Sequence, residues 1–195
     1  MDRALPVRWW DGGGFADAPF DAAMHVVGVR GQPDRATARR TIRSALLAAL
    51  AQASGLSPSS IRLCGAPGEA PWALLDDGRR VALSISHDGD LSVAALRLDG
   101  GAVGIDVMQV TDVPDWQAVA RDYLGPAAAA TLAGVPAFAR AWSEREARLK
   151  CRGLALAEWG GCDEPLLAAC TCLSLVLPDG YAGTVAVLPA PCPQR

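Results

Sequence analysis

Three strand-like segments follow one another in the middle of the chain with only short turns between them. They cover residues 81–86, 91–98 and 102–107. A His-Asp-Gly-Asp turn joins the first two, and a Gly-Gly pair separates the second from the third. Connections this short place strands next to one another. The centre of the chain is therefore predicted to be a set of adjacent strands against which the flanking segments pack.

A helical pattern precedes these strands. Asp34 is placed to cap its first turn and Gly55 to end it, and four apolar side chains between them recur at helical spacing. The four are Ile42, Leu46, Leu47 and Leu50. Three further helical patterns follow the strands, at about 115–123, 126–133 and 137–152.

The remaining segments complete two halves. A strand is predicted at 24–29, a hairpin around Pro-Asp-Gly at 171–177 and 182–188, and turn-rich stretches at 12–20 and 56–80. Each half then combines a long helix with a small sheet, and the break falls near residue 100. We predict an α+β fold of two similar α/β halves related by a pseudo-twofold, residues 1–101 and 102–195, in one compact two-lobed unit.

The charge and hydropathy of the chain argue against several classes of function. The formal net charge of −3 over 195 residues argues against a broad electrostatic grip on nucleic acid. Apolar runs are interrupted within about a dozen residues, short of the ~20 that a membrane span needs. The N-terminal residues lack a signal-peptide pattern. We expect a cytoplasmic protein with neither a nucleic acid nor a membrane as partner.

The six cysteines indicate neither a disulfide framework nor a zinc site. No Cys-x-x-Cys pair occurs, and both histidines, His25 and His87, are far in sequence from the cysteine cluster. Cys170 and Cys172 lie in a strand-like run with their side chains on one face. We expect reduced thiols at half-buried positions.

Lys150 is the only lysine, whereas the other seventeen basic side chains are arginine. The two residue types differ most where a compact ammonium with an adjustable pKa is needed. Chemistry is therefore one explanation for this lysine. The other is an ion pair on a helix with Glu146, four residues earlier, contributing about 0.3 kcal/mol.

Two further segments place polar side chains in or beside predicted strands. Ser86 and His87 follow hydrophobic residues at a strand end. A hydroxyl, an imidazole and backbone N–H groups there suit a phosphate or a polar ring, and a polar turn is the alternative. Asp106 lies within an apolar strand, where a buried acid must be paired or bind a metal. A divalent cation and a neighbouring loop are equally expected as its partner.

Helical spacing brings a third group of side chains together. Trp142, Glu146 and Lys150 follow one another at intervals of four residues and share one helix face. With Trp142 packed inward, Glu146 and Lys150 point toward a common site. The acid Glu146 and the second acid Asp106 form an oxygen-rich site that suits magnesium, which prefers a few carboxylates, waters and substrate phosphates. This combination predicts a phosphate-bearing substrate and phosphoryl-type transfer.

Taken together, these segments resemble the 4′-phosphopantetheinyl transferases, specifically the monomeric surfactin-synthetase-activating type. The matching motifs, in family order, are Ser84-Ile-Ser-His87, Gly104-Ile-Asp-Val107 and Trp142-Ser-Glu-Arg-Glu-Ala-Arg-Leu-Lys150. The similarity extends loosely to Ala38-Arg-Arg40-Thr-Ile and Tyr123-Leu-Gly and covers residues 35–160 or so. It implies that family's fold, with coenzyme A bound in the cleft between two similar halves.

The resemblance also implies an activity and its residues. The phosphopantetheine arm of coenzyme A would move to a serine of an acyl or peptidyl carrier protein, releasing 3′,5′-ADP. Asp106 and Glu146 match the family's magnesium-binding acids, and Lys150 matches the lysine that contacts the phosphate. These three residues are the expected catalytic group.

Other positions match the family's coenzyme-binding residues. Ser86 and His87 match residues that contact the 3′-phosphate region of the nucleotide. Arg40 matches a basic residue near the same end of the coenzyme. The apolar stretch 123–133 resembles the region that receives the carrier helix, and a packed core helix is the alternative there.

Three departures from the family pattern bear on the activity. Met108 stands where many relatives have Glu, and a thioether is a poor magnesium ligand, so water or Gln109 would fill the gap. Gly68-Glu-Ala-Pro71 replaces a Gly-Lys-Pro motif, and the glycine-rich tail is shortened to Cys151-Arg-Gly153. A second hypothesis is therefore a degenerate, non-catalytic homologue that binds coenzyme A or a carrier protein. The carrier class, whether fatty-acid, polyketide or peptide, stays open.

Overall fold

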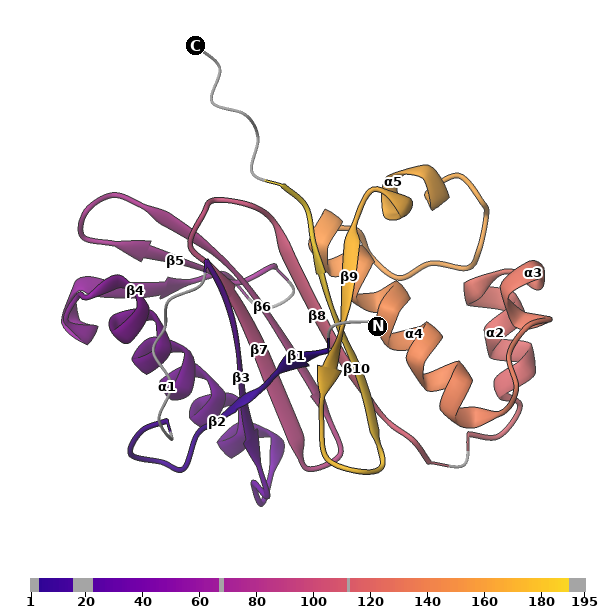
Figure 1. Cartoon of the computed structure of the whole chain (residues 1–195), viewed down its shortest axis with the longest axis horizontal. Helices are drawn as coiled ribbons and strands as arrows, with labels where there is room; N and C mark the ends of the chain where they lie inside the picture. Colours follow the sequence, from indigo (N-terminus) through magenta and orange to yellow (C-terminus); the bar gives the residue numbers. More distant parts are fainter. Residues whose placement is uncertain (1–3, 16–22, 67–68, 112, 190–195) are drawn as a thin grey trace, which may run out of the picture.

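The computed structural model describes residues 4–15, 23–66, 69–111 and 113–189, and it contains two β-sheets with a long helix on each (Figure 1). Its elements are β1 (Leu5–Pro6), β2 (Arg8–Trp9), β3 (Met24–Arg30), α1 (Arg35–Ser54), η1 (Pro58–Ser60), β4 (Ile61–Cys64), β5 (Trp72–Leu75), β6 (Arg80–Asp88), β7 (Leu91–Arg97), β8 (Val103–Gln109), α2 (Trp116–Leu124), α3 (Pro126–Ala129), α4 (Val135–Arg152), α5 (Glu164–Ala168), β9 (Thr171–Val176) and β10 (Tyr181–Val187). The α+β class is confirmed. Most of the predicted loop at 12–20 lies outside the described residues.

Three adjacent strands are arranged alike in the two sheets, β3-β7-β6 in one and β8-β10-β9 in the other. The six-stranded sheet runs β2-β3-β7-β6-β5-β4 and the four-stranded sheet runs β1-β9-β10-β8. In each half the strand that precedes the long helix pairs antiparallel with the last strand of that half, β3 with β7 and β8 with β10. β1 belongs by sequence to the N-terminal half, but it pairs with β9 of the other sheet. The N-terminal segment therefore crosses the boundary predicted at residue 101.

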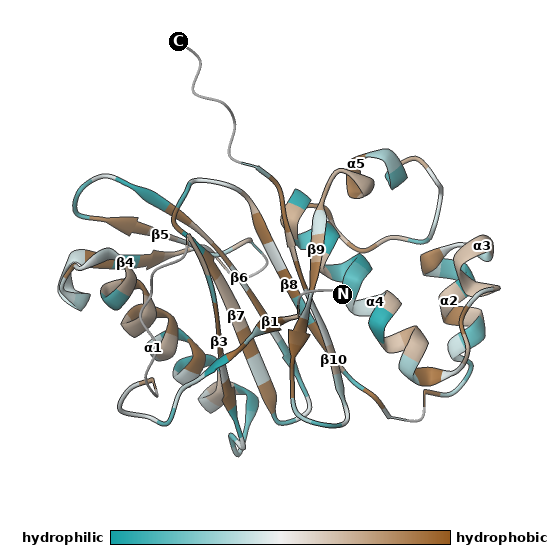
Figure 2. Ribbon diagram, viewed as in Figure 1, coloured by the Kyte–Doolittle hydropathy of each residue, from teal (hydrophilic) through white to brown (hydrophobic). Residues whose placement is uncertain are grey.

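The sheets pack face to face with a helix outside each. β7 shows this arrangement, because all of its residues are buried. Ala94 and Leu96 belong to the core beneath α1, whereas Leu91 and Val93 belong to the core between the sheets. Alternate side chains of a strand point to opposite faces, so both faces of this strand are covered. In Figure 2 the hydrophobic colour accordingly runs along the central strands, and the hydrophilic colour gathers at their turns and on parts of α4.

The caps of α1 are those that the sequence predicts. The Asp34 side chain accepts a hydrogen bond from the Thr37 N–H at 2.8 Å, and Gly55 ends the helix in a left-handed conformation with φ of 72°. Ile42, Leu46 and Leu50 are buried against the sheet. The predicted C-terminal hairpin is also confirmed, as β9 and β10.

Helix α4 lies directly on β8, and Gly104 permits this approach. A Cβ atom at Gly104 would collide with the backbone of Ala147 and Cys151. The helix ends at Gly153, whose φ of 67° is left-handed. The close approach brings Glu146 and Lys150 of α4 to the same cavity as Asp106 of β8.

Two segments differ from the sequence prediction. The stretch 56–80, predicted as turns, contains η1 and the antiparallel pair β4 and β5. Each of these strands has four residues, too few for an alternating pattern to stand out. The helix predicted at 126–133 is only the short α3, which ends at Ala129, and α4 begins after Gly134, where φ is 90°. Within the described ranges, none of the helices is long and apolar enough to cross a membrane.

Candidate functional site

The candidate site is built around the C-terminal end of β6. Alternate side chains of this strand have different surroundings. Leu83 and Ile85 pack in the core beneath α1, whereas Ser84 and Ser86 hydrogen-bond to β8. His87 therefore lies on the α1 side of the strand, although its neighbour Ser86 points to the other half.

Three β6 side chains accept backbone hydrogen bonds from β8, and we call Ser84, Ser86 and Asp88 the polar ladder. Ile105 N–H donates to Ser84 Oγ at 3.0 Å, Val107 N–H to Ser86 Oγ at 3.3 Å, and Gln109 N–H to Asp88 Oδ2 at 2.6 Å. Donors and acceptors are both spaced by two residues. One face of β6 thus takes the place of a neighbouring strand's backbone and joins the two halves.

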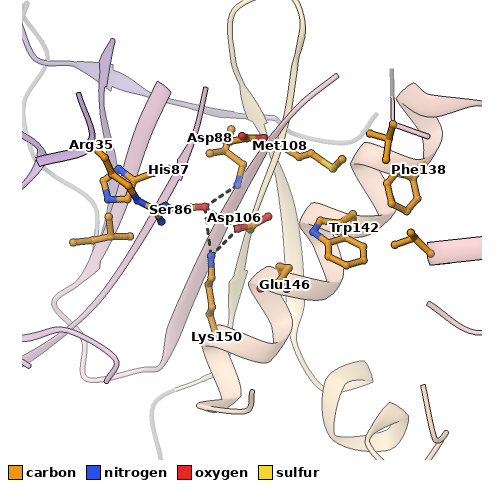
Figure 3. Close-up of a pocket in the computed structure, with 14 residues that line it drawn as sticks. Arg35, Ser86, His87, Asp88, Asp106, Met108, Phe138, Trp142, Glu146 and Lys150 are labelled. Carbon is orange, nitrogen blue, oxygen red and sulfur yellow. Dashed lines mark hydrogen bonds and ion pairs between the residues drawn. The ribbon is translucent and has the colours of Figure 1, made fainter. Parts of the chain in front are cut away.

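Asp106 lies between the polar ladder and α4. Its Oδ1 atom accepts hydrogen bonds from Ser86 Oγ at 2.7 Å and from Lys150 Nζ at 2.6 Å (Figure 3). The residue is only 6 % exposed. Burial raises the pKa of Asp106, and the Lys150 ammonium and the Ser86 hydroxyl oppose that rise. Asp106 is therefore a buried carboxyl with an ammonium and a hydroxyl as specific partners.

A cavity of about 490 Å³ opens beside this group. Five of the six predicted site residues line it, namely Ser86, His87, Asp106, Glu146 and Lys150. They come from β6, β8 and α4, and Figure 3 shows Lys150 reaching from α4 to Asp106 and Ser86. The structure thus brings together three motifs that are far apart in the sequence.

Glu146 has the electrostatic setting of a proton-transfer group. Burial raises the pKa of Glu146, and repulsion from the Asp106 carboxylate raises it further. Lys150 and Arg145 act in the opposite direction. A raised pKa makes the Glu146 carboxylate a stronger base than an exposed glutamate, which favours a role in proton transfer.

His87 faces a basic region. Its Nδ1 atom lies 2.7 Å from Ser92 Oγ. Burial, and then the charges of Arg35, Arg39 and Lys150, lower the pKa of His87 to about 4. The imidazole is therefore neutral at pH 7. The same positive charges would stabilise an anion bound beside it.

Arg40 is the predicted residue that the structure does not bring to the site. It lies on the exposed surface of α1, and its guanidinium donates to Thr37 Oγ1 at 2.9 Å. Arg35 lines the main cavity instead, and Arg39 and Arg43 line a second cavity of about 380 Å³ that also reaches His87. These three arginines recur every four residues and share one helix face, a spacing that was visible in the sequence.

Met108 belongs to an apolar wall of the main cavity. The wall consists of Met108, Val113, Val119, Phe138 and Trp142. The rings of Phe138 and Trp142 lie 5.7 Å apart between centroids.

Across the described ranges, no group of three or more His, Cys, Asp or Glu side chains is placed to hold a metal ion. Asp88 lines the same cavity, but it does not complete a three-ligand metal group with Asp106 and Glu146.

The described cysteines are free thiols, and only Cys64 and Cys172 are half-buried as expected, since Cys151 and Cys170 are buried and Cys162 is exposed. Burial raises the pKa of Cys151 to about 12, so this residue, next to Lys150 in sequence, stays protonated. Cys192 lies outside the described residues.

The chain matches no protein-family model, and a search of curated proteins found no match.

His87→Gln should reduce the loss of stability at acid pH. An unfolded histidine takes up a proton near pH 6.5, whereas His87 in the folded protein does so only near its pKa of about 4. Folding stability should therefore fall between these two values as the pH drops. Glutamine does not titrate and removes this contribution.

Urea unfolding of both proteins at pH 7 and pH 5 measures the effect. His25 is present in both proteins and cancels in the comparison. An equal loss of stability in the two proteins would contradict the assignment of a lowered pKa to His87.

Proposed function

We propose that the protein is a 4′-phosphopantetheinyl transferase. It moves the phosphopantetheine arm of coenzyme A to a serine of an acyl or peptidyl carrier protein, requires magnesium, and releases 3′,5′-ADP. The observation that carries the proposal is the meeting of Asp106, Glu146 and Lys150 at one cavity. The repeated strand order supports that family's fold, with the active site between the halves.

The cavities around β6 suit an extended, anionic ligand. The main cavity shares Ile85 and His87 with the second cavity, and it shares Ile85 and Lys150 with a third of about 410 Å³. Coenzyme A joins a 3′-phosphorylated nucleotide, a pyrophosphate and a long arm. Arg39 and Arg43 beside His87 supply the charge for the 3′-phosphate, in place of the predicted Arg40.

The two carboxylates fit magnesium as ligands. Magnesium is held in many sites by one or two carboxylates, and waters and substrate phosphates complete its shell. The repulsion that raises the pKa of Glu146 beside Asp106 is the kind that a divalent cation relieves. When bound there, magnesium supplies positive charge that neutralises the pyrophosphate oxygens.

The transfer requires three events at the carrier serine. Its hydroxyl loses a proton, its oxygen forms a bond to the β-phosphorus, and the phosphorus–oxygen bond to 3′,5′-ADP breaks. Glu146 takes the serine proton, directly or through a water molecule. Lys150, fixed beside Asp106 at 2.6 Å, places a compact positive charge next to the reacting phosphate.

The carrier protein approaches on the side of the apolar wall. Carrier proteins are acidic in general, so an apolar or basic surface suits them. The segment 123–133 is poor in acids, and its Leu124 packs in one hydrophobic cluster with Phe138 and Met108 of that wall. We further propose that the protein acts as a cytoplasmic monomer.

A non-catalytic homologue that binds coenzyme A or a carrier protein without transfer is the second candidate. Met108 favours it, because an apolar side chain stands where many relatives have a third acid.

Incubation with an apo carrier protein, coenzyme A and magnesium separates the two candidates. Transfer should add about 340 Da to the carrier, the mass of the transferred arm, as measured by intact-protein mass spectrometry. Chelation of magnesium should abolish the gain. Binding of coenzyme A by calorimetry without any mass gain would favour the non-catalytic homologue.

Lys150→Arg should lower kcat more than tenfold, equivalent to about 1.4 kcal/mol of transition-state stabilisation. The planar guanidinium cannot replace a compact ammonium beside Asp106. Arg152→Lys is the matched control, because this residue belongs to the last turn of the same helix but does not line the cavity. Normal turnover in Lys150→Arg would reduce Lys150 to a structural ion pair.

Arg39→Ala and Arg40→Ala should differ although the residues are adjacent and equally charged. Only Arg39 lines the cavity next to His87. Its removal should raise the KM for coenzyme A about tenfold, as expected for the loss of one charge-assisted hydrogen bond. Arg40→Ala should leave KM within about twofold. Steady-state kinetics decide the point, and the reverse order would favour the sequence-based choice of Arg40.

A further inference from the structure

The Ser86 hydroxyl has its full complement of hydrogen bonds inside the protein. A serine hydroxyl carries one proton and two lone pairs. The proton goes to Asp106 Oδ1 at 2.7 Å, while Val107 N–H and Lys150 Nζ donate to the oxygen at 3.3 and 3.4 Å. The residue is 6 % exposed. Binding a phosphate would require the hydroxyl to give up Asp106.

Ser84 offers a direct comparison within the polar ladder. It accepts the Ile105 N–H at 3.0 Å, lies on the same face of β6, and is 5 % exposed. It therefore makes the same kind of backbone contact as Ser86. The bond to Asp106 is what distinguishes Ser86 from Ser84.

We infer that Ser86 is a positioning residue that holds Asp106 for metal binding, and not a residue that contacts the nucleotide. This inference rests on the proposed function. Ser86 and Lys150 both donate to Asp106 Oδ1, and the Ser86 hydroxyl also accepts the N–H of the adjacent Val107. These bonds fix the Asp106 carboxylate relative to the backbone of β8. Hydrogen bonds of this kind orient the carboxylates that bind metals. Among the two residues of the Ser-His motif, only His87 then remains to bind the nucleotide.

Manganese binding tests the inference without any transfer reaction. Mn²⁺ prefers the same oxygen ligands as magnesium, and the electron paramagnetic resonance signal of free Mn²⁺ reports the dissociation constant. Ser86→Ala should weaken Mn²⁺ binding tenfold or more, the usual effect of removing a hydrogen bond to a metal ligand. Ser84→Ala should bind Mn²⁺ within about twofold of the wild type, although both variants lose a buried acceptor and similar stability against urea.

Conservative variants complete the design. Ser86→Thr keeps the hydroxyl and should retain most of the Mn²⁺ affinity. If Ser86→Ala does not fold, Ser86→Cys replaces it, because a thiol of similar shape is a weak donor and should show the same loss. Equal Mn²⁺ affinity in the Ser86 and Ser84 variants would overturn the inference.

Kinetics separate the two roles for Ser86. Ser86→Ala should raise the magnesium concentration needed for half-maximal transfer at least tenfold and leave the KM for coenzyme A nearly unchanged. The opposite result, a raised KM for coenzyme A with an unchanged magnesium requirement, would overturn the inference and assign Ser86 to the nucleotide.

If the wild type binds Mn²⁺ but transfers nothing, the proposed function fails and the Mn²⁺ comparison alone decides the role of Ser86. If the wild type binds no Mn²⁺, the inference itself is overturned.

Discussion

Strand β8 is an edge strand that is nevertheless buried, and its free backbone edge must find partners. β10 pairs with it on one side only, at the end of the four-stranded sheet. A buried N–H group without a partner costs about as much as a lost hydrogen bond. The polar ladder of β6 satisfies three such groups in succession. This arrangement fixes the register between the two halves, because a shift by one residue would turn Ser84, Ser86 and Asp88 away from β8.

The candidate site depends on that junction. Asp106 lies within β8, so the ladder that attaches the strand also sets the position of the carboxylate. A buried charge is costly to desolvate and is tolerated only with well-placed partners. Lys150 reaches it because Gly104 lets α4 lie directly on the strand. Side chains from both halves therefore meet only when the fold is complete, as expected of a site that lies between them.

The sequence predicted best where a segment carries its own strong pattern. The caps and apolar stripe of α1 and the C-terminal hairpin around Pro-Asp-Gly follow from local rules, and the structure has them. Strands β4 and β5 are short and depend on partners elsewhere in the sheet, so no local signal identified them. Motif matching selected Asp106, Glu146 and Lys150, which the fold brings to one cavity, and Arg40, which does not line it. The choice between Arg39 and Arg40 depends on which face of α1 turns toward His87, which the packing of the helix decides.

The same geometry explains why one lysine persists in a chain whose other basic residues are arginine. Lys150 Nζ donates to both Asp106 Oδ1 and Ser86 Oγ, two acceptors that are themselves hydrogen-bonded 2.7 Å apart. A compact ammonium can serve both acceptors from one point. A guanidinium prefers two parallel bonds to both oxygens of a carboxylate, which would rotate Asp106 away from Ser86. Replacement by arginine would thus disturb the carboxylate that the ladder holds in place, so the lysine and the ladder constrain the same atom.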